Sequence, residues 1–171
     1  EDAYRAAAFE EITKLIMATH GHTLVLFTSY DDMSETYQML KELDMPYPLF
    51  ALNRGDEQNL TAFRQSGNGV LLATGSVWEG MDFPGDIVSS LIMYKLPFPQ
   101  KTLLSEAQKS QYMSLQDFIG AVVVPMMQIS VMQGIGRGIR LASDTCVISI
   151  LDHRAAPESK YHHAVMDALP D

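Results

Sequence analysis

The sequence VLLATGSVWEGMDFPG, residues 70–85, decides the fold. Its first five residues, Val70 to Thr74, are apolar or β-branched, which is typical of a short strand that is buried on both faces. The strand runs directly into a loop, residues 75–85, that contains three glycines, a tryptophan and two carboxylates. In parallel α/β sheets the working residues lie in such loops, at the carboxyl ends of the strands.

Strand and helix patterns alternate on both sides of this stretch. Further strands are predicted at residues 23–27, 48–52, 88–94 and 146–151, whereas Pro97 and Pro99 exclude a central strand over 96–99. Helices are predicted at 2–19, from a cap at Asp31 or Asp32 to just before Pro46, from a cap at Asp56 to Gly67, in part of 103–119, from Pro125 to about Ile139, and at 161–169. This alternation predicts an α/β fold with a mainly parallel central sheet and helices on both faces.

The loop at residues 75–85 is the first candidate for chemistry. Glycines allow a backbone to approach a ligand closely, and loop amides can bind phosphate or sugar oxygens. An alternative stays open at this point, in which the loop is a packed turn, Trp78 covers the core, and Glu79 and Asp82 are solvated charges.

The second candidate is Gln133-Gly134-Ile135-Gly136-Arg137-Gly138-Ile139-Arg140. Arg137 and Arg140 are three residues apart, so they share one face of a helix, and paired guanidinium groups can clamp phosphate. Each glycine costs a helix about 1 kcal/mol relative to alanine, which indicates close packing or a backbone contact. The alternative is a surface helix end, where arginines favour the negative pole of the helix dipole.

Together these strings resemble motifs of the DinG/XPD family of DNA helicases. Residues 75–85 resemble its motif V, 133–140 its motif VI, and Thr23-Leu24-Val25-Leu26-Phe27-Thr28-Ser29-Tyr30 its motif IV. Leu96-Pro97-Phe98-Pro99 and Leu151-Asp152-His153-Arg154 look like later landmarks of the family. The matches follow the family's order from about residue 23 to the end, and the bacterial DinG-like branch fits better because of Trp78-Glu79-Gly80-Met81-Asp82 and Leu169-Pro170.

The resemblance implies one RecA-like domain over residues 1–171, the second motor of an ATP-dependent helicase. Arg137 matches the family's arginine finger, and Arg140 and Gln133 are the neighbouring motif VI positions that contact phosphate and the partner domain. In motif V, the residues that match the family's contacts with the nucleotide are Glu79, Gly80 and Asp82. The positions that match the family's contacts with single-stranded DNA are Thr28, Ser29, Thr74 and Ser76.

Several family features have no counterpart in this sequence. It contains neither the Gly-x-x-x-x-Gly-Lys-Ser/Thr loop that cradles phosphates nor an Asp-Glu-Ala-His motif for Mg²⁺. One cysteine, Cys146, cannot form the four-cysteine iron–sulfur cluster of many members. In the family these parts belong to the first motor domain, so ATP and Mg²⁺ are expected to bind mainly there. The chain also lacks an initiator Met, and we expect it to be a piece of a longer protein that is inactive by itself.

Composition and net charge limit the functions and cellular locations that are compatible with the sequence. The net charge of −9 argues against tight, autonomous DNA binding, because affinity for nucleic acids comes largely from neutralised phosphates. No apolar run approaches the roughly 20 residues that cross a bilayer, and residues 1–5 do not resemble a secretory signal. A single cysteine is typical of a reducing compartment. We therefore expect a cytoplasmic protein without a membrane partner.

Two further groups of residues invite a functional interpretation. His153, His162 and His163 lie near the end of the chain, but no cysteine or glutamate stands at metal-ligand spacing, so no metal site is expected. The methionines of the helix that leads to motif VI, such as Met126, Met127 and Met132, are expected to fill gaps in the core rather than form a binding stripe.

Two other functions are compatible with the sequence. Some DinG-like bacterial proteins join the motor to an exonuclease, so the domain could regulate a nuclease; an acidic exonuclease segment upstream would favour this. A non-enzymatic interaction module that uses the 75–85 loop is the third possibility, and a parent protein without a phosphate loop would favour it. The 5′-to-3′ polarity of unwinding follows from the family resemblance alone.

Overall fold

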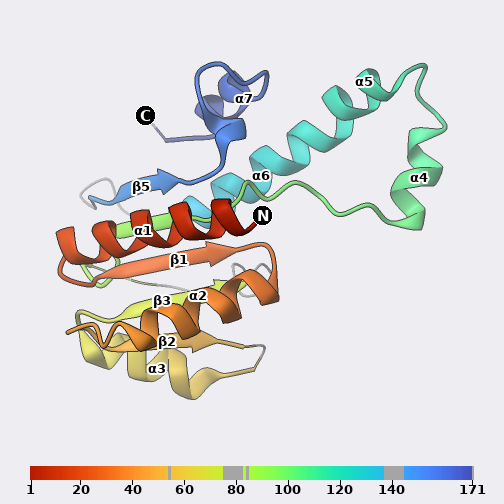
Figure 1. Ribbon diagram of the computed structural model, residues 1–171. Coiled ribbons are helices and arrows are strands. Elements are labelled where there is room, and N and C mark those ends of the chain that lie inside the picture. Colours follow the sequence, from red (N-terminus) through yellow and green to blue (C-terminus); the bar gives the residue numbers. More distant parts are fainter. Residues whose placement is uncertain (54, 75–82, 84, 137–144, 171) are drawn as a thin grey trace.

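The computed structural model describes residues 1–53, 55–74, 83, 85–136 and 145–170. Its centre is a five-stranded sheet with the order β2-β3-β1-β4-β5, and every pairing is parallel. The strands are β1 (Thr23–Phe27), β2 (Leu49–Leu52), β3 (Val70–Thr74), β4 (Ser90–Met93) and β5 (Val147–Ile150). The predicted parallel α/β fold is confirmed (Figure 1).

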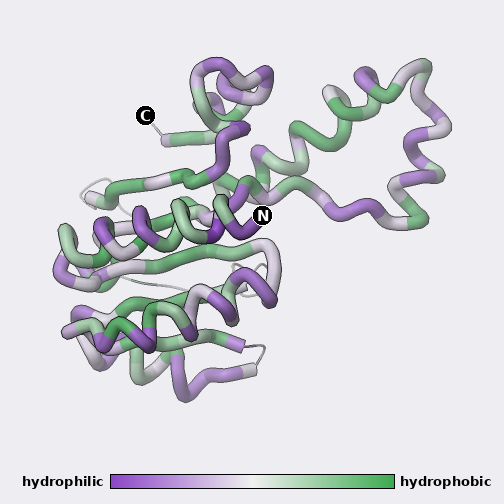
Figure 2. Tube along the Cα trace, in the orientation of Figure 1, coloured by the Kyte–Doolittle hydropathy of each residue, from purple (hydrophilic) through white to green (hydrophobic). Residues whose placement is uncertain are grey.

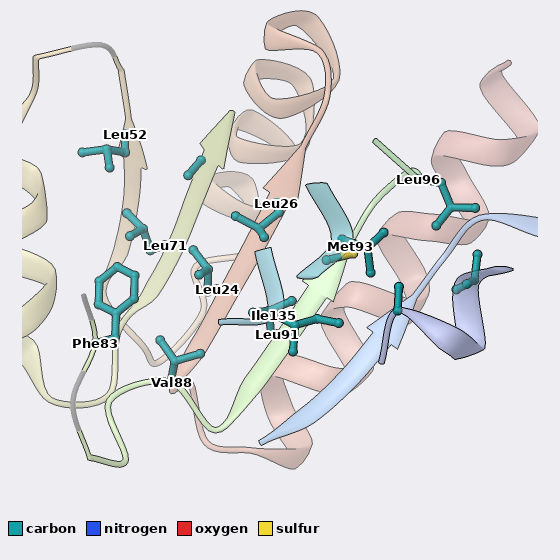
Figure 3. Packing of buried hydrophobic residues seen from close by; sticks show 14 of the residues in the cluster. Leu24, Leu26, Leu52, Leu71, Phe83, Val88, Leu91, Met93, Leu96 and Ile135 are labelled. Atoms are coloured by element: carbon teal, nitrogen blue, oxygen red, sulfur yellow. The ribbon is translucent and has the colours of Figure 1, made fainter. Parts of the chain in front are cut away.

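Helices cover both faces of the sheet. On one face lie α1 (Asp2–Ala18) and α2 (Tyr30–Glu42), which pack on alternate strand residues such as Val25 and Phe27. On the other face lie α3 (Glu57–Ser66), α6 (Val124–Ile135) and α7 (His162–Asp167), which pack on Leu24, Leu26 and Leu71 (Figure 3). This division follows from strand geometry, because successive side chains of a strand point to opposite faces.

The remaining described helices lie outside these two layers or connect to them. They are α4 (Leu103–Lys109), α5 (Leu115–Phe118), the π-helical turn η2 (Ile119–Val123) and the 3₁₀ turn η3 (His153–Ala155). Between α4 and α6 the chain extends away from the sheet as a helical arm (Figure 1).

Pro125 lies in the first turn of α6, as the sequence predicts, but helical backbone also precedes it. Helical backbone starts ten residues earlier, at Leu115, and continues through η2 into α6 without a break. Proline lacks the N–H of a helical hydrogen bond and crowds the preceding turn. The preceding turn widens to a π-helical spacing, in which the N–H of Val124 donates to the carbonyl of Ile119, and so accommodates the proline.

The continuous helix Leu115–Ile135 is long enough and apolar enough to cross a membrane, judged by length and composition alone. Gln116, Asp117 and Gln128 interrupt its apolar residues, so no apolar run of this length stands out in the sequence. Core helices of soluble proteins pass the same test. Here Met127, Val131 and Ile135 are buried against the sheet, so one side of the helix belongs to the domain core.

Candidate functional site

The carboxyl edge of the sheet brings motif IV and the start of motif V together. In the parallel pairing of β1 with β3, Phe27 lies opposite Thr74. Thr28 and Ser29 follow β1 directly, so their hydroxyl groups stand at the same edge as that of Thr74. All three side chains are half-buried. Three of the four residues assigned to DNA contact from sequence are therefore neighbours in the fold, and Ser76 lies outside the described residues.

Ser29, rather than Asp31 or Asp32, is the residue that caps α2. Its side-chain oxygen accepts a hydrogen bond from the backbone N–H of Asp32, over 3.4 Å. A serine with an extended backbone can reach the third N–H of the helix, whereas Asp31 and Asp32 already have helical geometry. The hydroxyl proton of Ser29 is not used by the cap, so it can be donated to a ligand oxygen.

A buried ionic cluster, which no local pattern in the sequence indicates, lies behind this cap. The carboxylate of Asp32, only 5% exposed, accepts from Lys95 Nζ over 3.0 Å and from Arg5 Nε over 3.2 Å. The ammonium of Lys95 also lies 5.3 Å from the ring centre of Tyr4. A cluster of this kind ties α1, α2 and the end of β4 to one another at the edge where motif IV lies.

Tyr4 extends the same network to β5. Its hydroxyl donates to the backbone carbonyl of Leu151, over 3.0 Å, and also lies in hydrogen-bonding contact with the carbonyl of Tyr94. Burial, and then the negative charge of Asp152, raises the pKa of the Tyr4 hydroxyl well above its usual value. The hydroxyl therefore keeps its proton as a donor at physiological pH, and α1 stays fixed to the carboxyl ends of β4 and β5.

A second buried carboxylate, Asp152, holds the segment Leu96-Pro97-Phe98-Pro99 in place. It accepts from the backbone N–H of Leu96 over 2.9 Å and from Arg154 Nη2 over 2.6 Å. The guanidinium carbon of Arg154 lies 4.6 Å from the ring centre of Phe98. The two landmarks recognised in the sequence at 96–99 and 151–154 thus form one structural unit, which joins β4 to β5 beyond their ladder.

This unit predicts a pH-dependent stability. Burial by itself would raise the pKa of Asp152, but hydrogen bonds from Arg154 and Leu96 outweigh it, so the folded pKa lies below the usual value. A lowered folded pKa stabilises the fold above the unfolded value of about 3.9, and this contribution is lost as the pH falls through the folded pKa. We expect Asp152→Asn to lower the free energy of unfolding at pH 7 by about 2 kcal/mol, the size of hydrogen bonds to a charged group.

Urea denaturation of the wild type and the variant at pH 7, and again below pH 3.9 (about the unfolded pKa), checks this prediction. The difference between the two proteins should shrink at the lower pH. Glu158→Gln, at an exposed carboxylate in the same segment, is the matched control and should change stability little at either pH. An Asp152→Asn difference that is equal at both pH values would contradict the assignment.

Motif VI is described only at its beginning. Gln133 is exposed on the last turn of α6, which ends at Ile135 and is followed by Gly136. The predicted continuation of this helix to Ile139, with Arg137 and Arg140, lies outside the described residues. The same holds for the motif V residues Glu79, Gly80 and Asp82, so the roles that the resemblance implies for both motifs stay predictions.

No described residues form a group of three or more potential His, Cys, Asp or Glu metal ligands. Nδ1 of His162 lies 2.8 Å from the carbonyl oxygen of Ala155. Burial raises the pKa of the Cys146 thiol to about 11, which keeps it protonated and therefore a poor nucleophile and metal ligand near neutral pH.

The structure is a parallel sheet with motif residues at its carboxyl edge. A comparison with protein families identifies the family to which this domain belongs. Residues 12–171 match the family model of the helicase C-terminal domain. The chain belongs to this helicase family. The two implied features, a RecA-like fold and membership of the DinG/XPD group, are confirmed.

Relatives of this helicase domain carry related names. The chain is 33% identical over 142 residues to the probable ATP-dependent helicase YpvA of Bacillus subtilis, which covers 82% of this chain and 22% of that protein. It is 32% identical over 154 residues to the 3′-5′ exonuclease DinG of the same organism, covering 86% and 16%. It is 31% identical over 164 residues to the ATP-dependent DNA helicase YoaA of Haemophilus influenzae, covering 95% and 26%. The chain therefore spans about a quarter or less of these relatives.

Solved structures support the same fold. The apo structure of XPD superimposes with a TM-score of 0.74 at 22% identity, over 95% of this chain and 34% of that one. A DEAD box protein from Methanococcus jannaschii follows, with a TM-score of 0.57 and 19% identity over 94% of this chain and 35% of that one. At such identities the likeness establishes the fold alone, which is RecA-like.

Proposed function

We propose that this domain is the second motor of an ATP-dependent DNA helicase. In this role it supplies Arg137 as an arginine finger to a nucleotide that is bound by a first motor domain of the same polypeptide. The family match over residues 12–171 carries the proposal, together with the names of relatives that extend far beyond the matched region. Mg²⁺ and the phosphates are held by the first motor domain, since no phosphate loop occurs in this sequence.

The edge formed by Thr28, Ser29 and Thr74 is the proposed contact for single-stranded DNA. Hydroxyl groups can donate to phosphate oxygens without adding positive charge, which suits a domain with a net charge of −9. Tyr30 follows these residues and is 58% exposed, so its ring is available to stack on a base. The ionic cluster of Asp32 with Lys95 and Arg5 supports this edge by holding the start of α2 in position.

Motif V has a coupling role in this proposal. Glu79, Gly80 and Asp82 bind the ribose side of the nucleotide and link it to Gln133 and Arg140 of motif VI. Thr74 ends β3, and the motif V loop follows it, so a shift of the loop on ATP hydrolysis reaches the DNA edge directly. This short covalent path is what allows one domain to couple the two ligands.

A second candidate has support from one relative, the 3′-5′ exonuclease DinG of B. subtilis. In that version the motor domain regulates a nuclease in the parent protein rather than unwinding DNA. The two candidates differ in product: a helicase separates strands of unchanged length, whereas a nuclease shortens them. Incubation of the full-length parent with a labelled duplex, with and without ATP, distinguishes strand separation from shortening.

The isolated domain is expected to lack ATPase activity and to bind single-stranded DNA weakly. The absent phosphate loop accounts for the first expectation, and the acidic charge and hydroxyl-based contacts for the second. Fluorescence anisotropy with a labelled oligonucleotide, titrated with salt, measures the binding, and the full-length parent serves as the active control. Binding that persists unchanged above about 0.2 M salt would contradict the proposed edge, because few phosphate contacts survive that counterion competition.

A further inference from the structure

The outer edge of β5 is open in this structure. β5 is the last strand of the sheet, and within the part of the chain that the structure describes only β4 pairs with it. The N–H groups of Val147 and Leu151 donate to carbonyls on the β4 side, over 2.9 Å each. Successive peptide groups of a strand point to opposite edges, so those of Ile148 and Ile150 point away from β4. Their N–H and C=O groups form half of a ladder that has no second strand.

A groove of about 660 Å³ runs along this edge. Its lining comes from both helix layers of the domain. Tyr4 and Ala8 belong to α1, which packs on one face of the sheet, whereas Val165 of α7 packs on the other face. A single groove can touch both layers only where it passes the edge of the sheet, so it lies beside β5, between α1 and α7 (Figure 1).

The unpaired ladder groups define the kind of occupant. Donors and acceptors at strand spacing match the backbone of an extended polypeptide, which adds as a further strand about 4.8 Å beyond β5. The walls suit its side chains, because Ala7 and Ala8 leave room and Met166, which is 49% exposed, offers apolar surface. Figure 2 shows mostly hydrophobic residues along β5 itself. The groove therefore fits a strand that carries apolar side chains.

Charge determines which polypeptide fits best. Glu11 and Asp152 line the groove, and no lysine or arginine is among its described lining residues. Asp152 already binds Arg154 over 2.6 Å. The carboxylate of Glu11 is 51% exposed and lies 3.9 Å from Lys14, which binds Glu10 more closely, over 2.9 Å. A phosphate backbone finds no cation here, whereas a lysine or arginine of the occupant can bind Glu11.

We propose that the outer edge of β5 binds an extended, basic segment of a partner protein as an added strand. A second copy of this chain matches the groove less well, because it would bring the same acidic side chains against Glu11 and carries the same net charge of −9. The inference does not depend on the helicase assignment. It gives the domain a protein-binding surface on β5, beyond the sheet edge formed by Thr28, Ser29 and Thr74.

Selection from a library of random octapeptides displayed on phage tests the proposal, with the full-length parent as the immobilised target. We expect enriched peptides that are rich in β-branched residues, carry lysine or arginine, and lack proline at their centre. The Ile148→Pro variant is the negative target. Proline removes the outward N–H of Ile148, and an edge strand tolerates it because that N–H does not bond to β4. Ile148→Ala keeps the N–H and is the matched control for the lost side chain.

Titration of the most enriched peptide, followed by fluorescence anisotropy, measures the size of each effect. Ile148→Pro should weaken binding by about tenfold or more, as expected for lost hydrogen bonds and a ring in the path of the added strand. Ile148→Ala should weaken it by much less. Glu11→Gln should weaken it by about two- to fivefold, the size of an exposed ion pair.

N-methylation of the same peptide tests the ladder without a change in the protein, so it decides the question even where Ile148→Pro fails to fold. Methyl groups on every second amide face β5 in one pattern and face away from it in the other. The first pattern should weaken binding by about tenfold, and the second should leave it within about twofold.

Four outcomes would overturn the proposal. They are no enrichment over a blank support, enriched peptides that are acidic, equal losses with the two methylation patterns, and equal losses in Ile148→Pro and Ile148→Ala. Occupation of the edge by another segment of the parent itself would give the first outcome. None of these measurements requires ATP turnover, so they are independent of the arginine finger.

Discussion

Replacing Arg137 by alanine in the full-length parent is expected to reduce DNA-stimulated ATP turnover by about 10³–10⁵-fold, the effect of removing an arginine finger. ATP binding should stay mostly intact. The two effects differ because the two motors act on different states of the nucleotide. The phosphate loop of the first motor domain binds the ground state, whereas the finger stabilises charge that develops on the transferring phosphoryl group. Steady-state ATPase assays, beside a nucleotide-binding titration, measure the two effects separately.

Three further variants sharpen this test. Arg137→Lys should restore little activity, since a compact ammonium does not reproduce the planar guanidinium fork. Arg140→Ala should be comparable or milder. Lys14→Ala, at a 62% exposed position on α1, is the neutral control. Domain stability should change by less than about 0.5 kcal/mol in each, because the proposed role of the two arginines is to contact phosphate and not to hold the fold, and Lys14 is exposed. Near-normal ATP turnover in a folded Arg137→Ala protein would contradict the assignment of Arg137 as the arginine finger.

Much of the fold could be predicted because its strands are short, buried and sharply bounded. The predicted limits of β1 and β3 agree with the structure, and β2 and β4 are only trimmed at their ends. The cap of α3 at Asp56 is confirmed, because its carboxylate accepts from the N–H of Asn59 over 3.3 Å. In each of these cases a few neighbouring residues determine the local structure, so a short stretch of sequence is enough to predict it.

Where the predictions failed, a competing local option won. Pro125 satisfied the rule for a first helical turn, but the backbone widened into a π-turn and kept the helix continuous. Met126 and Met132 are apolar, yet helical geometry places them opposite Met127, on the side away from the sheet. The hydrophobicity of a side chain indicates that it avoids water, but it does not indicate which face of the helix packs on the sheet.

The candidate site was predictable only where residues adjoin strand ends. Thr28, Ser29 and Thr74 follow from the positions of β1 and β3. The pairs Asp32–Lys95 and Asp152–Leu96 join residues that are 63 and 56 positions apart. Contacts between residues so far apart in the chain cannot be predicted from a local sequence pattern. Asp32 carried a cue, since Ser29-x-x-Asp32 is a capping pattern that identifies Ser29 as the cap. Arg137, Arg140, Glu79, Gly80, Asp82 and Ser76 stay predictions.

The second large effect concerns Gly21, at the turn that sets the register of β1 beside β3. Gly21 has a φ of +81°, and an added Cβ would lie 1.8 Å from the carbonyl oxygen of Asn68. We expect Gly21→Ala to destabilise the domain by about 3–5 kcal/mol, which combines the cost of a left-handed alanine with severe overpacking. For a domain of this size the melting temperature should fall by about 10 °C.

Gly67→Ala separates the two causes of this destabilisation. Gly67 has nearly the same φ, +76°, but nothing lies within 4 Å of its added Cβ. It should therefore show only the conformational cost, about 1–2 kcal/mol, reduced by the lower entropy of the unfolded chain. The excess of Gly21→Ala over Gly67→Ala in urea denaturation then measures the collision with Asn68. Because Asn68 lies two residues before Val70, the first residue of β3, we expect relief of that collision to shift β3 against β1 and so to separate Thr74 from Thr28. Equal losses in the two variants would mean that the turn yields freely, and that this contact does not set the register on which the proposed DNA edge depends.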